Sequence, residues 1–493
     1  MEKGSSAQEI DHVVKEAWLA YHVFRKLPLE RRATFMRTVA AHIELISDDL
    51  VRIAMAETNL PDARLRGEKN RTVFQLNSYA DACERGEWLE AKIDQAAPLR
   101  AIPKPDTRKT LMGLGPVVVF GASNFPFAYS TAGGDTACAW AAGCPVIVKA
   151  HPAHRKTSDA VAAAIFKAIS ICQLPNAIFS HIHGDGFEAG NQLVIHPLVK
   201  AVGFTGSFTG GKALFDLANQ RKEPIPVFAE MGSINPVFIL PDKLKGAEAE
   251  IAGLYAGSIT LSVGQFCTNP GLVIGVNGPE LDKFVECLGQ AIKQIAPGSM
   301  LHQGIAKNFA EKKELALAQR EVETVAVSEI EGKENEGIPT IASASGQAFL
   351  NNPVLHQEVF GPYSLVIRCS SSEEMLDIAK KIEGQLTSTL IASETDIRKH
   401  EDLVEAIKNI CGRLIFNGVP TGVEVSLSMH HGGPFPATTD SRFTSVGADG
   451  IKRFARPICF QNWPDHLLPD ELQNANPLGI WRTVNNELTK AGI

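Results

Sequence analysis

The sequence predicts an α/β protein built on a doubly wound parallel sheet, followed by a second α/β unit. From Gly113 onward, short apolar runs of four to six residues alternate with helical segments. β-branched and aromatic residues fill these runs and small or polar residues close them, as in buried parallel strands. At 493 residues, the chain is long enough for two or three domains. We therefore expect helices on both faces of the sheet and ligands at the carboxyl ends of its strands.

The first 95 residues are predicted to be helical. Apolar positions recur every three or four residues in Ala17–Phe24 and Arg32–Ile46, with charges between them. Pro28 precedes the second segment, where its fixed φ suits the start of a helix. A further helix is expected over Gly67–Gly86, and the Pro-rich, basic segment Leu99–Leu111 is expected to form an extended arm.

The two sheets can be outlined from the apolar runs. In the first, the expected strands are Pro116–Phe120, Cys144–Val148, Ala177–His181 and Ala201–Phe204, and the expected helices are Asp135–Ala142, Ser158–Ile171, Gly186–Ile195 and Gly210–Ala218. The second runs from Met231 to about Pro436, with strands expected at Pro236–Leu240, Leu272–Val276, Tyr363–Ile367, Ser388–Ala392 and Leu414–Asn417.

Charge and composition argue against several classes of function. The net charge is −7 and basic runs are absent, so no nucleic-acid partner is expected. No apolar run approaches the roughly 20 residues that cross a bilayer, so no membrane partner is expected. The first residues are polar, without the apolar segment of a signal peptide. Nine cysteines lack zinc-like spacing, so we expect no metal and free thiols in a reducing compartment, most simply the cytoplasm.

One cysteine lies in a polar turn. Cys267 belongs to Ser262–Gly271, a Gly- and Pro-bounded turn between the apolar runs Ala252–Leu261 and Leu272–Val276. A buried structural cysteine usually lies inside an apolar run, whereas backbone amides and solvent can reach a sulfur in a turn. Cys267 is therefore a candidate nucleophile, although a loop cysteine without a role fits these residues equally well.

A carboxylate and an amide also follow apolar strands. Glu230 closes Pro226–Ala229, and apolar neighbours there would raise its pKa toward that of a general base. The alternative is a Glu that caps the next segment. Asn124 follows the strand Pro116–Phe120, and its amide could donate to a developing oxyanion. Ordinary turn chemistry explains such an Asn as well.

Two further sites suit a phosphorylated ligand. The segment Phe204–Gly211, which contains Gly206 and Ser207, opens a helix after a strand, and the amides of a helix N-terminus attract phosphate. It departs from the GxGxxG fingerprint of dinucleotide-binding proteins. Lys149 ends another strand and could bind a ribose or phosphate, or be a solvated edge residue.

Several of these stretches together resemble the aldehyde dehydrogenase superfamily, in the order in which that family carries them. They are Phe-Gly-Ala-Ser-Asn-Phe-Pro (120–126), Phe-Thr-Gly-Ser (204–207), Ala-Glu-Met-Gly (229–232), Gly-Gln-Phe-Cys-Thr-Asn-Pro-Gly (264–271), Glu-Val-Phe-Gly-Pro (358–362) and Phe-Asn-Gly (416–418). Six ordered motifs that span nearly the whole chain are far more specific than any one of them.

The resemblance implies a role for each matching residue. Cys267 would attack the aldehyde to form a thiohemiacetal, and Asn124 with the backbone amide of Cys267 would form the oxyanion hole. Glu230 would activate the water that hydrolyses the resulting thioester, since a thiolate is a good nucleophile and a thioester a labile intermediate. The implied cofactor contacts are Glu358 and Phe360 at the nicotinamide ribose and ring, with Lys149, Gly206 and Ser207 near the adenosine ribose and the pyrophosphate.

The family also implies an architecture. Residues 1–98 and 113–231 would form a doubly wound cofactor-binding domain, and residues 232–436 an α/β catalytic domain. Residues 99–112 and 437–493 would form a small bridging arm that pairs subunits. A homodimer or homotetramer is therefore expected.

Other stretches, including Glu57–Leu65, Ala132–Ala137, Val148–His154 and His431–Thr438, look like the α-ketoglutaric semialdehyde (2,5-dioxopentanoate) dehydrogenases. The implied reaction is 2,5-dioxopentanoate plus NAD(P)⁺ and water to 2-oxoglutarate. Alternatives are an NADP-dependent dehydrogenase of medium- or long-chain fatty aldehydes and a catalytically idle binding homologue. A coenzyme A-acylating enzyme is disfavoured, because such relatives typically lack the acid at Glu230.

The sequence points to NADP as the cofactor, with NAD possible. Relatives that prefer NAD often carry a glutamate three residues beyond the strand-end lysine, where this chain has Pro152. Asp185 and Glu188, however, stand where an arginine would favour a 2′-phosphate. A substrate carboxylate would need a cation, and Arg71 is a speculative candidate, with a solvated helix residue as the alternative.

Overall fold

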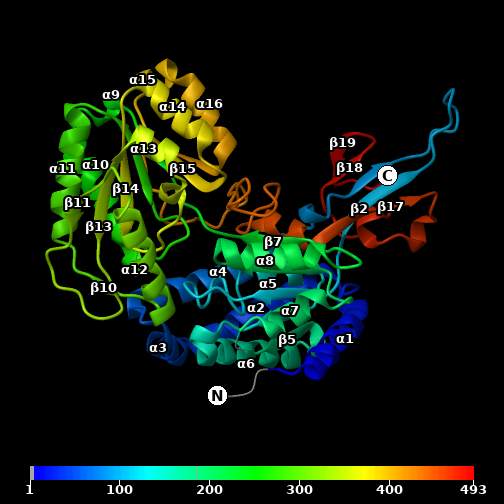
Figure 1. Cartoon of the computed structure of the whole chain (residues 1–493). Coiled ribbons are helices and arrows are strands. Elements are labelled where there is room, and N and C mark those ends of the chain that lie inside the picture. Colours follow the sequence, from blue (N-terminus) through cyan, green and yellow to red (C-terminus); the bar gives the residue numbers. More distant parts are fainter. Residues whose placement is uncertain (1–4, 185) are drawn as a thin grey trace.

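The computed structural model describes residues 5–184 and 186–493 and contains three larger sheets (Figure 1), besides a two-stranded one that pairs β10 (Gly298–Ser299) with β12 (Glu336–Gly337). Within those ranges, the first sheet has five strands in the order β5-β4-β3-β6-β7, all parallel. They are β3 (Val117–Phe120), β4 (Val146–Lys149), β5 (Phe179–Ile182), β6 (Ala201–Thr205) and β7 (Val227–Glu230). The predicted doubly wound parallel sheet is confirmed.

Helices cover both faces of this sheet because its strands are apolar on both sides. Val117 and Val119 pack into one buried cluster, while Val118 packs into another on the opposite face. On the first face lie α2 (Leu29–Leu45), α3 (Ser47–Thr58), α4 (Asp62–Arg85), α5 (Gly134–Ala141) and α6 (Arg155–Ile171). On the second lie α7 (Glu188–Ile195), α8 (Phe208–Asn219) and the first half of α1 (Ala7–Phe24).

The second sheet, again counting described residues only, has seven strands in the order β11-β13-β14-β9-β8-β15-β16. They are β8 (Val237–Ile239), β9 (Leu272–Val276), β11 (Val322–Val327), β13 (Thr340–Ser345), β14 (Tyr363–Cys369), β15 (Gln385–Ile391) and β16 (Cys411–Phe416). All neighbours are parallel except β11 and β13. One face packs on α10 (Glu248–Thr260) and α11 (Pro279–Lys293). The other packs on α12 (Gln303–Leu317), α13 (Gly346–Asn351), α14 (Ser372–Lys381) and α16 (Glu401–Ile410).

A third, smaller sheet projects from the body (Figure 1). Its order is β17-β2-β1-β18-β19, with β1 (Lys92–Asp94), β2 (Thr107–Gly113), β17 (Ala455–Gln461), β18 (Arg482–Val484) and β19 (Glu487–Thr489). The sheet therefore begins before residue 99, while residues 437–446 lie against β7 instead, where Met231 N donates to Ala437 O. The division into domains stays a prediction.

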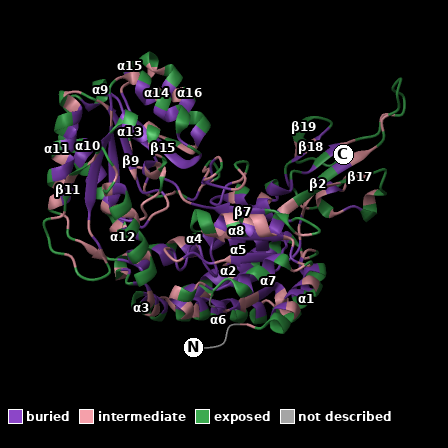
Figure 2. Cartoon of the chain, viewed as in Figure 1, coloured by how far each residue is buried: buried purple, intermediate pink, exposed green. Residues whose placement is uncertain are grey.

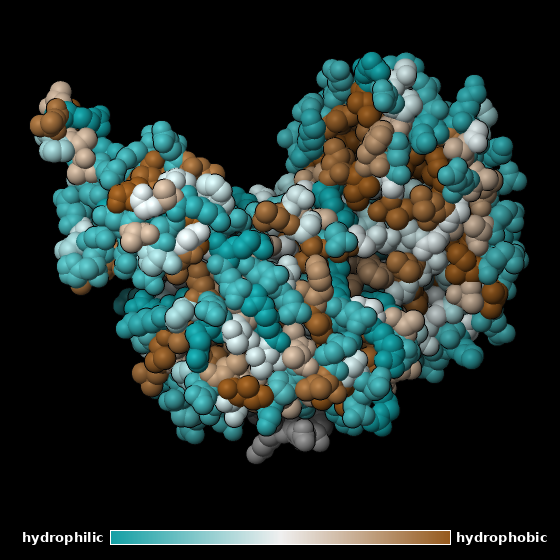
Figure 3. Space-filling view, turned by 180° about the vertical axis from the view of Figure 1, so that it is seen from behind, coloured by the Kyte–Doolittle hydropathy of each residue, from teal (hydrophilic) through white to brown (hydrophobic). Residues whose placement is uncertain are grey.

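In both large sheets the strands are buried, whereas the helices that cover them are exposed on their outer sides (Figure 2). Seen from behind, the molecule is hollowed between the projecting sheet and the lobe of the second sheet (Figure 3). Among the helices of the described ranges, none is both long and apolar enough to cross a membrane.

Candidate active site

Cys267 lies on a tightly held loop between α10 and β9. Asn235, fully buried, donates from Nδ2 to the carbonyl oxygens of Cys267 and Asn269, both at 2.9 Å. Gly264 has φ +65°, and a Cβ there would overlap the Gly361 backbone, so only glycine fits this turn. Fixed carbonyls and an obligatory glycine hold the sulfur in one place.

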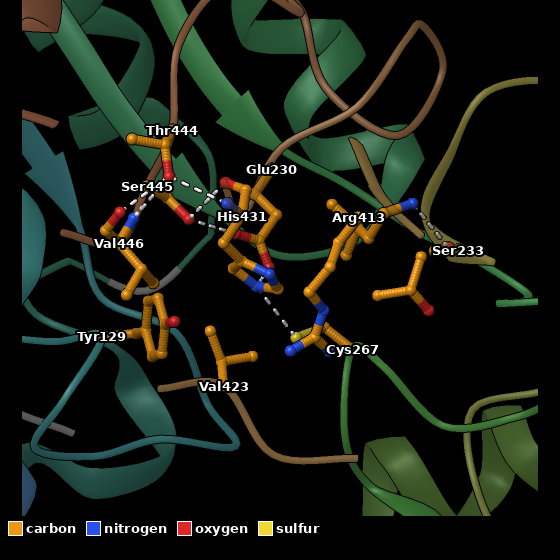
Figure 4. A network of polar contacts seen from close by, with 12 residues as sticks. Tyr129, Glu230, Ser233, Cys267, Arg413, Val423, His431, Thr444, Ser445 and Val446 are labelled. Atoms are coloured by element: carbon orange, nitrogen blue, oxygen red, sulfur yellow. Dashed lines mark hydrogen bonds and ion pairs between the residues drawn. The ribbon is translucent and has the colours of Figure 1, made fainter. Parts of the chain in front are cut away.

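Three polar side chains from distant parts of the chain meet at this sulfur (Figure 4). The Sγ of Cys267 lies 3.6 Å from Nε2 of His431, and that nitrogen lies 3.1 Å from Oε1 of Glu230. Ser445 donates from Oγ to Oε2 of Glu230 at 2.7 Å. Glu230 ends β7, whereas His431 and Ser445 come from the loop that follows the second sheet. The carboxylate is thus buried, hydrogen-bonded and next to the thiol.

The electrostatics of the cluster differ from the expectation for Glu230. Burial alone would raise the pKa of Glu230, but the charge and hydrogen bond of His431 and the hydroxyl of Ser445 lower it below its usual value. The raised pKa predicted from apolar neighbours is therefore wrong. Burial, with the nearby charge of Glu230, instead raises the pKa of the Cys267 thiol well above its usual range. The resting site holds a carboxylate beside a neutral thiol.

Asn124 lies next to the cysteine loop, as the sequence predicted. Its Nδ2 donates to the carbonyl oxygen of Gln265 at 3.2 Å, two residues before Cys267. The segment that carries it is held by α4: Arg64 donates to Asn124 O at 3.3 Å, and Glu68 Oε1 accepts from Phe127 N at 2.8 Å. The side-chain amide of Asn124 is thereby held against the loop that carries the sulfur of Cys267.

A cavity of about 880 Å³ opens between the two sheets and reaches Cys267. It is large enough for a dinucleotide-sized ligand. It brings together most of the predicted site residues: Asn124, Gly206, Ser207, Glu230, Cys267, Glu358 and Phe360. Lys149, buried at the end of β4, and Arg71 do not line it.

The chain matches the aldehyde dehydrogenase family over residues 3–444. It belongs to that family. It is 47% identical to alpha-ketoglutaric semialdehyde dehydrogenase 2 of Azospirillum brasilense, over 97% of this chain and 92% of the relative. It is 43% identical to an alpha-ketoglutaric semialdehyde dehydrogenase of Acinetobacter baylyi, over 99% of this chain and 92% of that protein.

The fold agrees with solved members of the family. The crystal structure of succinic semialdehyde dehydrogenase from Streptococcus pyogenes, in complex with NADP⁺, superposes with a TM-score of 0.77. The match covers 93% of this chain and 96% of that one at 19% identity. This aldehyde dehydrogenase is an oxidoreductase that acts on aldehydes.

The cavity of this aldehyde dehydrogenase offers a phosphate cradle at the start of α8. Ser207 caps the helix, and its Oγ accepts from Gly210 N at 3.3 Å. A Cβ on Gly206 or Gly210 would press on the ring of Phe204, so glycine at both positions lets the backbone pass close to that ring. Their own N–H groups are engaged, since Gly206 N donates to Glu230 O and Gly210 N to Ser207 Oγ. Free amides at a helix N-terminus suit a pyrophosphate.

The structure describes most, but not all, of the residues at the end of the cavity where the adenosine is predicted to bind. Lys149 ends β4, and its Cε lies near Gly184 in the loop that precedes α7. His151 lines the cavity two residues further on. Glu188 starts α7 and accepts from Gln192, whereas Asp185 lies outside the described residues.

Glu358 stands on the catalytic side of the cavity. Its Oε1 lies 3.5 Å from Ser233 N, and a Cβ on Gly232 would collide with its carboxylate. Burial raises the pKa of Glu358 to about 7, although the charge of Lys312 lowers it in part. Because burial raises the pKa of this carboxyl group, its ionised form lowers the stability of the folded protein.

We expect Glu358→Gln to stabilise the cofactor-free protein above pH 7. The folded form keeps a proton that the unfolded form releases near pH 4.5, so this group's contribution to stability falls as pH rises from about 4.5 to 7. Each pKa unit corresponds to about 1.4 kcal/mol, and since the side chain keeps some solvent contact, we expect a gain of about 2 kcal/mol at pH 8.5.

Thermal unfolding at pH 5 and pH 8.5 measures this effect, with Glu250→Gln on the exposed start of α10 as the matched control. A gain in Tm that is equal at both pH values, or one that the control shares, would contradict it.

Sequence reasoning missed three residues of this site. His431 and Ser445 lie 164 and 178 residues beyond Cys267 in the chain, and Asn235 carries no motif of its own. His431 belongs to the stretch His431–Thr438 that pointed to the subfamily, but nothing local indicates that it faces Glu230. These residues can be identified only from their positions in the folded structure.

Proposed function

We propose that this protein oxidises 2,5-dioxopentanoate to 2-oxoglutarate, with NADP as hydride acceptor and water as the second substrate. The observation that carries the hydrolytic route is the Cys267–His431–Glu230–Ser445 cluster, in which a buried, ionised carboxylate adjoins the thiol. The two relatives above 40% identity are both named for this substrate.

In the first half of the reaction, Cys267 attacks the aldehyde carbon. Because its thiol is protonated at rest, the proton must leave as the C–S bond forms, and the adjacent carboxylate of Glu230 is the acceptor. The carbonyl oxygen becomes an oxyanion that Asn124 Nδ2 and the backbone amide of Cys267 stabilise, a contact worth about 3 kcal/mol in other enzymes.

In the second half, a thioester on Cys267 is hydrolysed. Bound NADP supplies the hydride acceptor for its formation from the thiohemiacetal. Glu230 first releases to solvent the proton that it took from the thiol, and its carboxylate then takes a proton from water, whose oxygen attacks the thioester carbon. The C–S bond breaks, the carboxylic acid leaves, and the proton held by Glu230 returns to the sulfur. His431 and Ser445 hold Glu230 in its ionised form, so the base is ready at neutral pH.

The residues of the cavity fit a bound dinucleotide. Ser207 and Gly206 would hold the pyrophosphate at the start of α8, Lys149 the adenosine ribose, and Glu358 and Phe360 the nicotinamide ribose and ring. No acid stands at Pro152, the position from which a glutamate would repel a 2′-phosphate. This supports NADP as the preferred cofactor.

Initial rates of reduced-cofactor formation test the proposal, with 2,5-dioxopentanoate and decanal each offered with NAD⁺ and NADP⁺. We expect the dioxo acid with NADP⁺ to give much the highest kcat/KM, without coenzyme A. A preference for decanal would place the protein among fatty aldehyde dehydrogenases. An absolute need for coenzyme A would exclude the hydrolytic route, and no turnover with any aldehyde would leave a binding homologue.

We also propose that the projecting sheet pairs subunits into a homodimer or homotetramer. Leu99 and Ile102 at its tip are exposed, as is Leu488 on β19. Leu414 and Phe416 are exposed on β16, which ends the order of the seven-stranded sheet and leaves a strand edge. Such surfaces suit association of copies.

A further inference from the structure

We propose that Arg413 and Arg71 together form the cationic end of the aldehyde pocket and bind the carboxylate of an acidic aldehyde. The inference rests on the proposed function and extends it, because it assigns the recognition of the substrate's charge to two residues. Arg413 comes from β16 and Arg71 from α4, and both donate to the loop that contains Val423.

Both guanidinium groups are tied to one short stretch of backbone. Arg413 donates from Nη1 to Gly422 O at 3.0 Å and from Nη2 to Pro420 O at 2.6 Å. Arg71 donates from Nη1 to Val423 O at 2.8 Å, and its Nη2 lies 3.5 Å from the Tyr129 hydroxyl. Neutral carbonyls position the two cations but leave their charges uncompensated.

Among the described residues, no carboxylate forms an ion pair with either arginine, and the Nε of each is buried without a hydrogen-bond partner. Arg64, which lies close by over the ring of Phe125, is different because Glu68 neutralises it at 2.6 Å. Glu424, the acid next to Val423 on the loop that both arginines contact, is exposed and accepts from Val425 N. A half-buried cation without a counter-charge is costly unless a ligand supplies one.

The two cations face the reacting sulfur. Figure 4 shows the Arg413 guanidinium beside Cys267, with Val423 and Tyr129 on the same side. The charge of Arg71 partly lowers the pKa of the Cys267 thiol. Burial lowers the pKa of Arg413, whereas Cys267 and Tyr129 partly raise it. Neither arginine lines the cofactor cavity.

The geometry suits a short acidic aldehyde. Four C–C bonds separate the aldehyde and carboxylate carbons of 2,5-dioxopentanoate, or about 5 Å when extended. A carboxylate on an aldehyde that Cys267 holds therefore stays close to the sulfur, beside which the Arg413 guanidinium lies (Figure 4). Arginine binds carboxylates through two parallel N–H groups, and each Nη nitrogen that donates to a backbone carbonyl here carries a second N–H group.

The test compares Arg413→Met, Arg71→Met and the double variant with the wild type. The measured quantity is the ratio of kcat/KM for 2,5-dioxopentanoate to that for pentanal, a neutral aldehyde of the same length. We expect this ratio to fall about 100-fold in the double variant, mainly through KM of the acid. Calorimetric titration with 2-oxoglutarate gives a readout without turnover, and its affinity should fall by a similar factor.

Arg221→Met is the matched control, because Arg221 likewise donates to two carbonyls, Val194 O and Val199 O, far from the thiol. Arg413→Lys keeps the charge and should recover part of the ratio. An equal loss with both aldehydes would mean that the arginines only hold the loop, and an unchanged ratio would likewise overturn the inference. If the wild type itself does not prefer the acid, the proposed substrate fails, whatever the variants do.

Discussion

Cys267→Ala is expected to lower kcat for aldehyde oxidation by about 10⁴-fold or more, because the covalent route has no alternative without the sulfur. Residues from both large α/β units line the cofactor cavity, and Cys267 is only one of these lining residues. Binding of NADP, measured by titration calorimetry, should therefore stay within about threefold of the wild type.

Cys287→Ala provides the control for loss of a thiol as such, since Cys287 is also partly buried but lies on α11. It should leave kcat unchanged. Turnover that survives in Cys267→Ala would contradict the covalent mechanism, and loss of both turnover and NADP binding would show a folding defect instead.

Glu230→Gln is expected to separate the two halves of the reaction. Without a base for hydrolysis, the thioester should accumulate, so rapid mixing should show up to one reduced cofactor per subunit. The burst should form more slowly than in the wild type, because Glu230 no longer accepts the thiol proton, and the turnover that follows should be slower by about 10³-fold. The variant also removes one cause of the raised thiol pKa of Cys267. Alkylation of Cys267 by iodoacetamide at pH 8 should therefore be faster than in the wild type.

His431→Gln tests the same base through its environment, because it keeps a donor near Glu230 but removes the charge. The pKa of Glu230 is lowered by His431, so it should rise in this variant and the acidic limb of kcat/KM should move to higher pH. Activity should recover above that limb. A burst absent from Glu230→Gln, or an acidic limb that His431→Gln leaves in place, would assign the base to another group.

The first sheet could be predicted because its strands are short, apolar on both sides and closed by small residues. β13 and β11 were missed for opposite reasons. Thr340–Ser345 is buried but consists of small residues that carry little strand signal, and Val322–Val327 is mostly exposed at the edge of the sheet. The surrounding sheet, more than local propensity, makes them strands.

The candidate site was predictable where a residue lies in a distinctive short motif next to a strand, as with Cys267 before β9, Glu230 at the end of β7 and Asn124 after β3. The protonation state of Glu230 was not, because it depends on His431 and Ser445, whose sequence separations from it are 201 and 215. Charge compensation in a folded site is set by neighbours in space. The same holds for Arg413, which only its place beside Cys267 distinguishes from any other strand arginine.

The buried amides near Cys267 also bear on how this enzyme could be redesigned. Gln385 Oε1 accepts from Ser233 Oγ and Ile234 N, and Asn235 of the same segment holds the Cys267 carbonyl. Glu230 lies only a few residues upstream, so one short segment links the base to the nucleophile's loop. The two arginines belong to α4 and β16, outside this segment. The preference for one aldehyde over another could therefore be rebuilt at these two positions while the chemical machinery stays intact, as long as Arg64 and Glu68 of α4 are kept to hold the Asn124 segment.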